Sequence, residues 1–334
     1  MADSDRIRVF HGASRRRFLG LGAGMMAASA LFKLTGCGSS QPLMFGSHVW
    51  PGYEFLFLAD RQGWLKEHGV RLLETRSATE SLEALAQGRI HAATLTLDEV
   101  MQGRSLGIPL SVVLLFDISA GADAVLAKSR LESLGALRGL RIGVETSAVG
   151  SLVLQKTLAM AGLKRADVKV VPVTVNEHIS TWAADEVDVL ITYEPTASKL
   201  ESAGAIRILD SRHFPDTIFD TLAVNGDTIA DHGEQIRSLI RSHFQGLRSW
   251  QQNPIEHAIG MAAHLGVEPD RVATLYRGLE LPDVEFNRHL LTPPAQELHQ
   301  AVTAIRDAAL DTTKEPEALS APLFTPDYLP SVDL

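Results

Sequence analysis

The chain of 334 residues has a single cysteine, Cys37, so no disulfide bond can form within it and its stability has to come from a hydrophobic core. It has no apolar run of transmembrane length, because the uncharged stretch at residues 18–32 is shorter than the about 20 residues that span a bilayer. It also lacks the Gly-x-Ser-x-Gly, phosphate-loop and His-Glu-x-x-His patterns of three enzyme classes. We therefore expect a protein that is not an enzyme and that uses neither a cofactor nor a metal ion.

Basic residues are scarce once the N-terminus is set aside. The whole chain has a formal charge of −9, but its first 36 residues hold six Lys or Arg and only two Asp or Glu. The 298 residues that follow have 25 basic and 38 acidic side chains, a net charge of −13. A domain this acidic is a poor nucleic-acid binder, so we expect no nucleic-acid partner. Its length is sufficient for two domains.

The first 36 residues have the features of an export signal. Residues 14–20 (Ser-Arg-Arg-Arg-Phe-Leu-Gly) are typical of a twin-arginine signal, and the uncharged stretch that follows fits its apolar region. The sequence Leu-Thr-Gly-Cys at 34–37 then resembles a lipoprotein cleavage site, with Cys37 as the lipidated residue. We expect residues 1–36 to be a signal peptide and 37–42 a lipid-anchored tether, which places the domain on the periplasmic side of the membrane. The alternative is a basic tail followed by a short buried helix.

From residue 43 onward, short β-like runs alternate with helical patterns, which is typical of βα units around a mainly parallel sheet. The sequence predicts strands at 43–49, 70–74, 91–94, 108–116, 140–144, 168–173 and 187–192, and helices at 53–64, 80–87, 147–161 and 177–184. From residue 227 the pattern is almost wholly helical, with helices predicted at 227–252, 254–265 and 293–309 before a proline-containing tail.

One internal similarity indicates two lobes. Residues 86–94 resemble residues 183–191 at an offset of 97 positions. Each segment ends a helix, makes a polar turn and enters a buried strand that polar residues follow. Two halves of similar order predict two α/β lobes that face each other, although helix–turn–strand units can also look alike by chance.

Four segments in order carry a resemblance to a known family. They are residues 49–54 (Val-Trp-Pro-Gly-Tyr-Glu), 88–93 (Gly-Arg-Ile-His-Ala-Ala), 117–123 (Asp-Ile-Ser-Ala-Gly-Ala-Asp) and 137–144 (Leu-Arg-Gly-Leu-Arg-Ile-Gly-Val). Together they resemble the nitrate/sulfonate/taurine (NitT/TauT-like) substrate-binding proteins of ABC importers, a fold family that includes the binding proteins for the thiamine pyrimidine precursor. The resemblance covers most of residues 43–265.

The resemblance implies a type II periplasmic binding protein fold, with two α/β lobes of mixed sheets joined by a two-strand hinge. It places lobe one at 43–126 plus 226–334, lobe two at 127–225, and the crossing strands near 123–128 and 222–225. It also implies a monomer that captures a small-molecule solute by lobe closure and delivers it to the membrane subunits of an ABC importer.

One position departs from the family pattern. The family often has Asp in the turn before the third strand, where this chain has His91, whereas lobe two keeps Asp188 at the equivalent turn. We expect a local structural change at His91 and no loss of binding.

The candidate site follows from the rule that ligands bind at the carboxyl ends of strands, near helix N-termini. The residues that the sequence places there are Trp50, Tyr53, Glu54, Ser77, Thr79, Thr96, Asp98, Asp117, Ser147, Val149, Gly150, Tyr193 and Glu194. Several have ordinary alternatives, since Trp50 could be a rim hydrophobe and Ser77 could simply cap a helix. We assign Asp123 a structural role near the hinge.

The ligand class follows from the residue types. Acids together with aromatic rings suit a planar, nitrogen-containing or cationic solute, through stacking and hydrogen bonds to carboxylates. The small residues at 147–151 would instead suit an anionic group at a helix start. We therefore expect a nitrogen-containing solute. A small sulfonate or other anion, a sensor lipoprotein, and an enzyme on the same fold are the alternatives.

Overall fold

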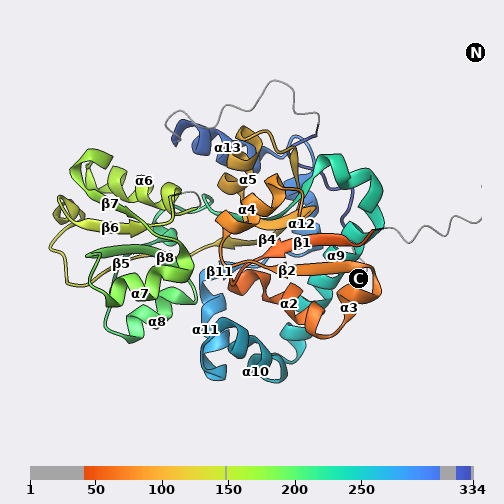
Figure 1. Cartoon of the computed structure of the whole chain (residues 1–334), viewed down its shortest axis with the longest axis horizontal. Helices are drawn as coiled ribbons and strands as arrows, with labels where there is room; N and C mark the ends of the chain where they lie inside the picture. Colours follow the sequence, from red (N-terminus) through yellow and green to blue (C-terminus); the bar gives the residue numbers. More distant parts are fainter. Residues whose placement is uncertain (1–40, 147–148, 309–320, 332–334) are drawn as a thin grey trace, which may run out of the picture. The chain divides into compact units, whose positions relative to one another are not determined.

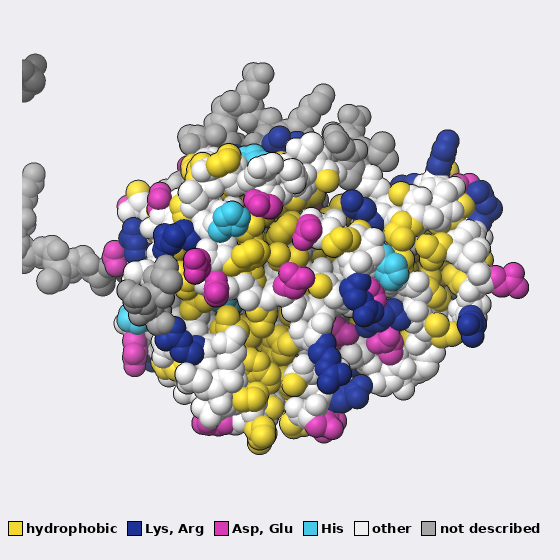
Figure 2. Space-filling model, turned by 180° about the vertical axis from the view of Figure 1, so that it is seen from behind, with side chains coloured by type: hydrophobic (Ala, Val, Ile, Leu, Met, Phe, Trp, Pro, Cys, Tyr) yellow, Lys and Arg dark blue, Asp and Glu magenta, His cyan; other side chains and the backbone are white. Residues whose placement is uncertain are grey.

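The computed structural model describes residues 41–146, 149–308 and 321–331, which form two mixed β-sheets flanked by helices (Figure 1). Within these residues no helix is both long enough and apolar enough to cross a bilayer. Charges of both signs are interspersed on the face shown in Figure 2, with hydrophobic side chains reaching the surface between them.

The first sheet has six strands in the order β11-β4-β10-β3-β1-β2. Their bounds are β1 Leu43–Ser47, β2 Val70–Glu74, β3 Ala92–Thr96, β4 Leu110–Ser119, β10 Phe219–Asn225 and β11 Leu279–Glu280. Strand β1 pairs in parallel with β2 and β3, whereas β10 runs antiparallel between β3 and β4. Both β3 and β4 are buried along their whole length, which explains why most of their residues are apolar.

The helices of this lobe come from both ends of the chain. Their bounds are α2 Glu54–Arg61, α3 Trp64–Glu67, α4 Ala78–Ala86, α5 Leu97–Ser105, α9 Gly226–Gln252, α10 Pro254–Leu265, α11 Val272–Leu275, α12 Val284–Leu291 and α13 Gln296–Ala308, and a 3-10 turn, η1, covers Pro51–Tyr53. Of these, α10 packs on α2 and α9 and not on the sheet. Helix α10 has the predicted bounds because Pro254 starts its first turn and Gly266 ends it with a left-handed φ of 64°.

The second sheet has five strands in the order β7-β6-β8-β5-β9. Their bounds are β5 Asp123–Ala127, β6 Arg141–Val144, β7 Lys169–Pro172, β8 Val189–Tyr193 and β9 Ile206–Asp210, and the helices are α6 Val149–Ala161, α7 His178–Ala183 and α8 Thr196–Ser202. Strand β6 is parallel to β7 and β8, while β5 runs antiparallel between β8 and β9.

The two sheets share one strand plan. The order β2-β1-β3-β10-β4 of the first corresponds to β7-β6-β8-β5-β9 of the second, with the same parallel and antiparallel pairings. Helix α4 and strand β3 end at residues 86 and 96, and α7 and β8 end at 183 and 193, so the offset of 97 recurs. The prediction of two α/β lobes with mixed sheets is confirmed.

His91 performs the function of its counterpart Asp188. The His91 Nδ1 atom accepts a hydrogen bond from the Met44 backbone N–H at 3.0 Å, and the Asp188 Oδ2 atom accepts one from the Arg141 N–H at 2.8 Å. Because Nδ1 is the acceptor, the ring proton lies on Nε2. The expected local change at His91 is therefore a change of acceptor, from carboxylate to imidazole.

The chain passes between the sheets at other residues than predicted. Strand β5 pairs within the second sheet and β10 within the first, so the connections are residues 120–122 and 211–218. The predicted lobe boundaries, at 126/127 and 225/226, assign both strands to the opposite sheet. Apolar runs show where a strand lies but not which sheet it joins, which depends on distant partners.

Hydrogen bonds join the two connections to each other. The Ser211 hydroxyl lies 2.8 Å from the Ser119 hydroxyl and accepts the Gly121 N–H at 2.6 Å. From β9, the Arg207 guanidinium donates to the Gly121 carbonyl at 2.6 Å. Gly278 allows this close packing, because a Cβ there would lie 2.7 Å from the Ala122 nitrogen.

Asn287 connects α12 to the interior of the first sheet. Its fully buried amide accepts the Leu115 N–H at 2.7 Å and donates to the Leu115 carbonyl at 3.0 Å. The side chain thus satisfies the backbone of a central strand where β11 does not reach.

We expect Asn287→Ala to lower the free energy of unfolding by about 2–4 kcal/mol, since it leaves a buried N–H and a buried carbonyl unpaired. Urea unfolding measures the loss, and Glu285→Ala on the exposed face of the same helix should change stability by less than about 0.5 kcal/mol. A loss below about 1 kcal/mol for Asn287→Ala would show that water replaces the amide.

Candidate functional site

Two small adjoining pockets lie where the strand ends of the two sheets meet. The first is lined by His48, Trp50, Thr96, Glu99, Asp123, Val149, Tyr193, Ile218 and Asp220. The second is lined by Asp123, Glu145, Val149, Gly150, Val153, His178, Ile191, Thr192 and Tyr193. Each offers about 10 Å³, about the room of one water molecule, so a larger solute requires the lobes to part.

Aromatic rings from both lobes meet in the first pocket. The Trp50 ring, which follows β1, packs edge-on against the Tyr193 ring at the end of β8, with centroids 5.4 Å apart. Tyr53 lies behind Trp50 and packs edge-on against His48 at 5.4 Å and Phe116 at 5.2 Å. Aromatic rings from both lobes therefore form part of the wall of this pocket.

A pair of carboxyl groups lies under these rings. Asp117 and Asp220 are directly opposite each other on β4 and β10. The Trp50 indole N–H donates to Asp117 Oδ2 at 3.1 Å, and the Tyr53 hydroxyl donates to Asp220 Oδ1 at 2.5 Å. Burial raises the pKa of Asp117 to about 7, and burial together with the Asp117 charge raises the pKa of Asp220 well above its usual range. Two adjacent buried carboxylates cannot both ionise easily, so the pair keeps a proton at neutral pH.

Two further acids connect the lobes. The Glu99 carboxyl on α5 accepts the Thr96 N–H at 2.8 Å and, from the other lobe, the Val149 N–H at 3.2 Å. After β6, the Glu145 carboxyl accepts the Thr79 hydroxyl at 2.5 Å. Both contacts join one lobe directly to the other. The Glu99 carboxyl thereby accepts the backbone N–H group at the start of α6.

The lining histidines are neutral. Burial lowers the pKa of His48 and of His178 to about 4. The His178 Nε2 atom lies 3.3 Å from the Val173 carbonyl, so it carries the proton, and Nδ1 accepts from the Thr192 hydroxyl at 3.0 Å. No Lys or Arg is among the lining residues that the structure describes.

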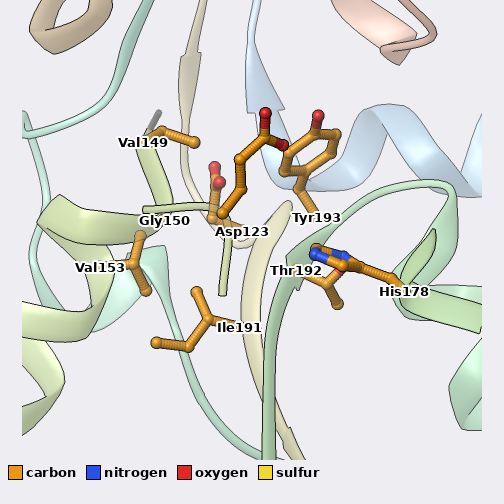
Figure 3. Close-up of a pocket in the computed structure, with 9 residues that line it drawn as sticks. Asp123, Val149, Gly150, Val153, His178, Ile191, Thr192 and Tyr193 are labelled. Atoms are coloured by element: carbon orange, nitrogen blue, oxygen red, sulfur yellow. The ribbon is translucent and has the colours of Figure 1, made fainter. Parts of the chain in front are cut away.

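Figure 3 shows the second pocket. The Asp123 carboxylate points into the space between Val149 and Tyr193, while Val153 and Ile191 form the opposite wall. Within the described residues, no group of three or more His, Cys, Asp or Glu side chains is arranged to hold a metal ion.

The structure brings some of the predicted site residues together. Trp50, Thr96, Val149, Gly150 and Tyr193 line the pockets. Three others lie next to them, since Tyr53 and Asp117 bond to lining residues and Thr79 bonds to Glu145.

Other predicted residues lie elsewhere. Ser77 accepts the Glu80 N–H at 3.3 Å and caps α4, and Asp98 is half-buried in the first turn of α5 outside both linings. Ser147, like Cys37, is outside the described residues.

Two predicted site acids have partners outside the pockets. The fully buried Glu54 carboxyl bonds to His264 and lies 3.5 Å from Arg61. The Glu194 carboxyl accepts from Arg207 at 3.2 Å and from the Ser198 N–H at 3.0 Å.

Sequence reasoning missed several lining residues, namely His48, Glu99, Glu145, His178, Asp220 and the central position of Asp123. The rule that places site residues after the carboxyl end of each strand fails for β5 and β10. These strands are antiparallel to their neighbours, so their first residues lie at the edge of the sheet where the parallel strands end. Asp123 and Asp220 lie at the starts of these two strands, each ahead of an apolar run. An acid in that position is the sequence signal that could have identified them.

Two α/β lobes of mixed sheets, with a closed site between their strand ends, define the periplasmic binding protein fold. The chain belongs to the NMT1/THI5-like family, whose model matches residues 50–257. A protein of Brucella abortus (strain 2308) that is named as a binding protein is 24% identical over 197 residues, which cover 57% of this chain and 60% of that protein. The match thus spans less than two thirds of this curated relative.

Solved structures agree with the fold. The alkanesulfonate-binding protein SsuA from Xanthomonas axonopodis pv. citri, bound to MOPS, superposes with a TM-score of 0.67 at 18% identity, covering 82% of this chain and 97% of that one. The desulfurization enzyme DszB has a TM-score of 0.56 at 16% identity, covering 84% and 97%. The predicted fold class and family resemblance are confirmed, and an enzyme shares the fold at lower similarity.

The buried acids make the stability of the folded protein depend on pH. An acid whose pKa is raised keeps its proton in the folded state after the unfolded chain has lost it, so stability falls as pH rises toward about 7 for Asp117 and Asp123. His48 and His178, with pKa values lowered to about 4, have the opposite effect below pH 6.5. Above pH 6.5 these histidines are neutral in both the folded and the unfolded states, so the acids determine how stability changes with pH.

We expect the free energy of unfolding to fall between pH 6.5 and 8 by about 1 kcal/mol for each such carboxyl, and Asp117→Asn to remove its share. Urea unfolding at several pH values measures this, with the exposed Asp185→Asn as the matched control. If stability rises over this interval, or if Asp117→Asn keeps the wild-type profile, the pKa of Asp117 is not raised.

Proposed function

We propose that this protein is a solute-binding protein that captures a small nitrogen-containing, cationic solute between its lobes and delivers it to the membrane subunits of an ABC importer. We further propose that it acts as a non-catalytic monomer, held on the periplasmic side of the membrane by a lipid on Cys37. The family and the fold support the general role.

One observation carries the solute class. The pockets are lined by four acids, Glu99, Asp123, Glu145 and Asp220, and by histidines that are neutral, without a Lys or Arg among the described lining residues. Such a cavity favours a cation or a group rich in N–H donors and opposes an anion. The Trp50 and Tyr193 rings would hold a planar body by stacking and cation–π contact.

A sulfonate or similar anion is the second candidate, because a structural neighbour is an alkanesulfonate-binding protein. The start of α6 is where an anion would accept backbone hydrogen bonds. In this chain the Glu99 carboxyl accepts the Val149 N–H there. An anion would have to displace an acid, so we favour the cationic solute.

The contacts that cross the cleft support binding by lobe closure. A solute between Trp50 and Tyr193 would contact both lobes, and closure around it would exclude water. The solute shifts the balance toward closure only through contacts that it makes more strongly in the closed form.

Thermal-shift screening tests the solute class, with benzamidine, benzylamine and 2-aminopyrimidine against taurine and nitrate. A ligand at about 100 times its dissociation constant stabilises a protein by about 2.7 kcal/mol. We expect a nitrogenous cation to raise the melting temperature and the anions to leave it unchanged. Micromolar binding of taurine or nitrate would overturn the cationic class.

We expect Trp50→Ala and Tyr193→Ala to weaken binding of the screened cation at least about tenfold, because each removes one wall of the pocket. Titration calorimetry measures the affinity, and circular dichroism checks that each variant is folded. Trp182→Ala, which lies outside both pockets against Lys128, is the matched control and should bind normally. Wild-type affinity in both cleft variants would place the site elsewhere.

We expect Cys37→Ser to release the protein from the membrane fraction into the soluble periplasmic fraction, since no other cysteine can carry a lipid. Fractionation followed by immunoblotting measures this. The contrary result is a Cys37→Ser protein that stays with the membranes to the same extent as the wild type.

A further inference from the structure

We infer that Asp123 is the specificity-determining residue of the cleft, that its carboxylate binds the protonated nitrogen of the solute, and that this binding expels a proton from the carboxyl group. The inference rests on the proposed function and goes beyond it by assigning the residue and the proton.

Asp123 has the central position in the site. It is the one acid that lines both pockets among the described residues, and its side chain is 3% exposed. Its Oδ2 atom is buried without a hydrogen-bond partner. The residue begins β5, directly opposite Tyr193 on β8, so a rigid strand pair positions it.

The repeat between the lobes indicates why the Oδ2 atom of Asp123 lacks a hydrogen-bond partner. Asp123 stands opposite Tyr193 in lobe two as Asp220 stands opposite Thr96 in lobe one. In lobe one the Tyr53 hydroxyl donates to Asp220 at 2.5 Å. The position 97 residues after Tyr53 is Gly150, which has no side chain to donate.

Gly150 lines the second pocket and presents no side chain to it. A Cβ at this residue would lie 2.7 Å from the Glu145 carbonyl oxygen, so the backbone packing does not accommodate a larger residue. A solute N–H group would therefore supply to Asp123 the donor that Tyr53 supplies to Asp220.

The other acids of the cleft are already bonded. Glu99 accepts two backbone N–H groups, and Glu145 accepts the Thr79 hydroxyl and the Val175 N–H. Asp117 and Asp220 also have one unpartnered oxygen each, but these belong to directly paired carboxyls that a shared proton serves. Asp123 has no such paired carboxyl, and its side-chain hydrogen bond with Ser119 leaves the Oδ2 atom without a partner.

Asp123 also has no counter-ion of its own. The titratable and charged groups around it are Asp98 and Glu99 on α5, Asp117 on β4, Asp220 on β10, Glu145 after β6, Tyr193 at the end of β8, Glu194 after β8, Arg207 on β9, His48 and His178. Arg207 is the permanent cation among them, and it is bound by Glu194 at 3.2 Å and Glu201 at 2.9 Å. Burial raises the pKa of Asp123 to about 7, so a cation entering near neutral pH replaces a proton that leaves to solvent.

Three probes of similar shape test the charge that the site selects. Benzamidine is cationic between pH 5 and 8, benzamide is neutral and benzenesulfonate is anionic. We expect titration calorimetry to show benzamidine binding at least about tenfold more tightly than either of the others. Its affinity should be about 100-fold weaker at pH 5 than at pH 8, because only the ionised carboxylate binds it. Titration in two buffers of different ionisation enthalpy counts the released proton.

Variants assign that proton to Asp123. We expect Asp123→Asn to bind benzamidine at least about tenfold more weakly at pH 8, with a flattened pH profile and no proton release attributable to this residue. Asp123→Glu keeps the charge and should retain the pH dependence at reduced affinity, which provides a test if the amide variant fails to fold. Asp185→Asn, at an exposed position with a φ of 60° that Asn tolerates, should behave as wild type.

The outcomes separate this inference from the proposed function. Equal benzamidine affinity in wild type and Asp123→Asn, or an unchanged pH profile, would overturn the role of Asp123. Tighter binding of benzenesulfonate or taurine would overturn it too, while solute capture by the cleft would stand. If no probe of either sign binds, both the inference and the proposed solute class fail.

Discussion

Carboxyl groups buried without matching cations are the constraint on which the chemistry of the cleft depends. Burial disfavours the charged form of each acid, so the empty site must hold protons or leave its acids partly unpaired. Each of these buried acids lowers the stability of the protein without a bound solute. Binding sites commonly lower stability in this way because function requires groups that folding alone would not favour. A cation bound there, as we propose, would relieve that cost, because it would supply both the charge and the hydrogen-bond donors.

The fold delivers these acids through its antiparallel strands. In each sheet one antiparallel strand lies beside the central parallel strand, and its first residues reach the edge where the parallel strands end. Asp220 and Asp123 occupy equivalent positions in the two lobes. Two neighbours distinguish them. In lobe one Tyr53 donates a hydrogen bond to Asp220 and Asp117 lies directly opposite it, whereas lobe two has Gly150, which has no side chain to donate.

The sequence predicted the scaffold better than the site. Local signals specify elements such as β2, predicted at 70–74, and α10, predicted at 254–265, because alternation, proline and glycine mark their ends. The role of Glu54 depends on His264, which is 210 residues away, and a pairing that distant leaves no local pattern. Strand β9 and helices α5, α8 and α12 were not predicted either, since their short apolar patterns become informative only within the packed sheets.

Charge and closure are coupled in this arrangement. In the closed form Glu99 and Glu145 bond across the lobes while Asp123 is shut away from water. Ionising Asp123 inside the closed cleft costs desolvation free energy, whereas in an open cleft water solvates the charge. If Asp123 binds a cation as we propose, ionisation of the protein without its solute favours opening, and the bound cation favours closure because it neutralises that charge. The same acid would then link recognition of the solute to the movement of the lobes.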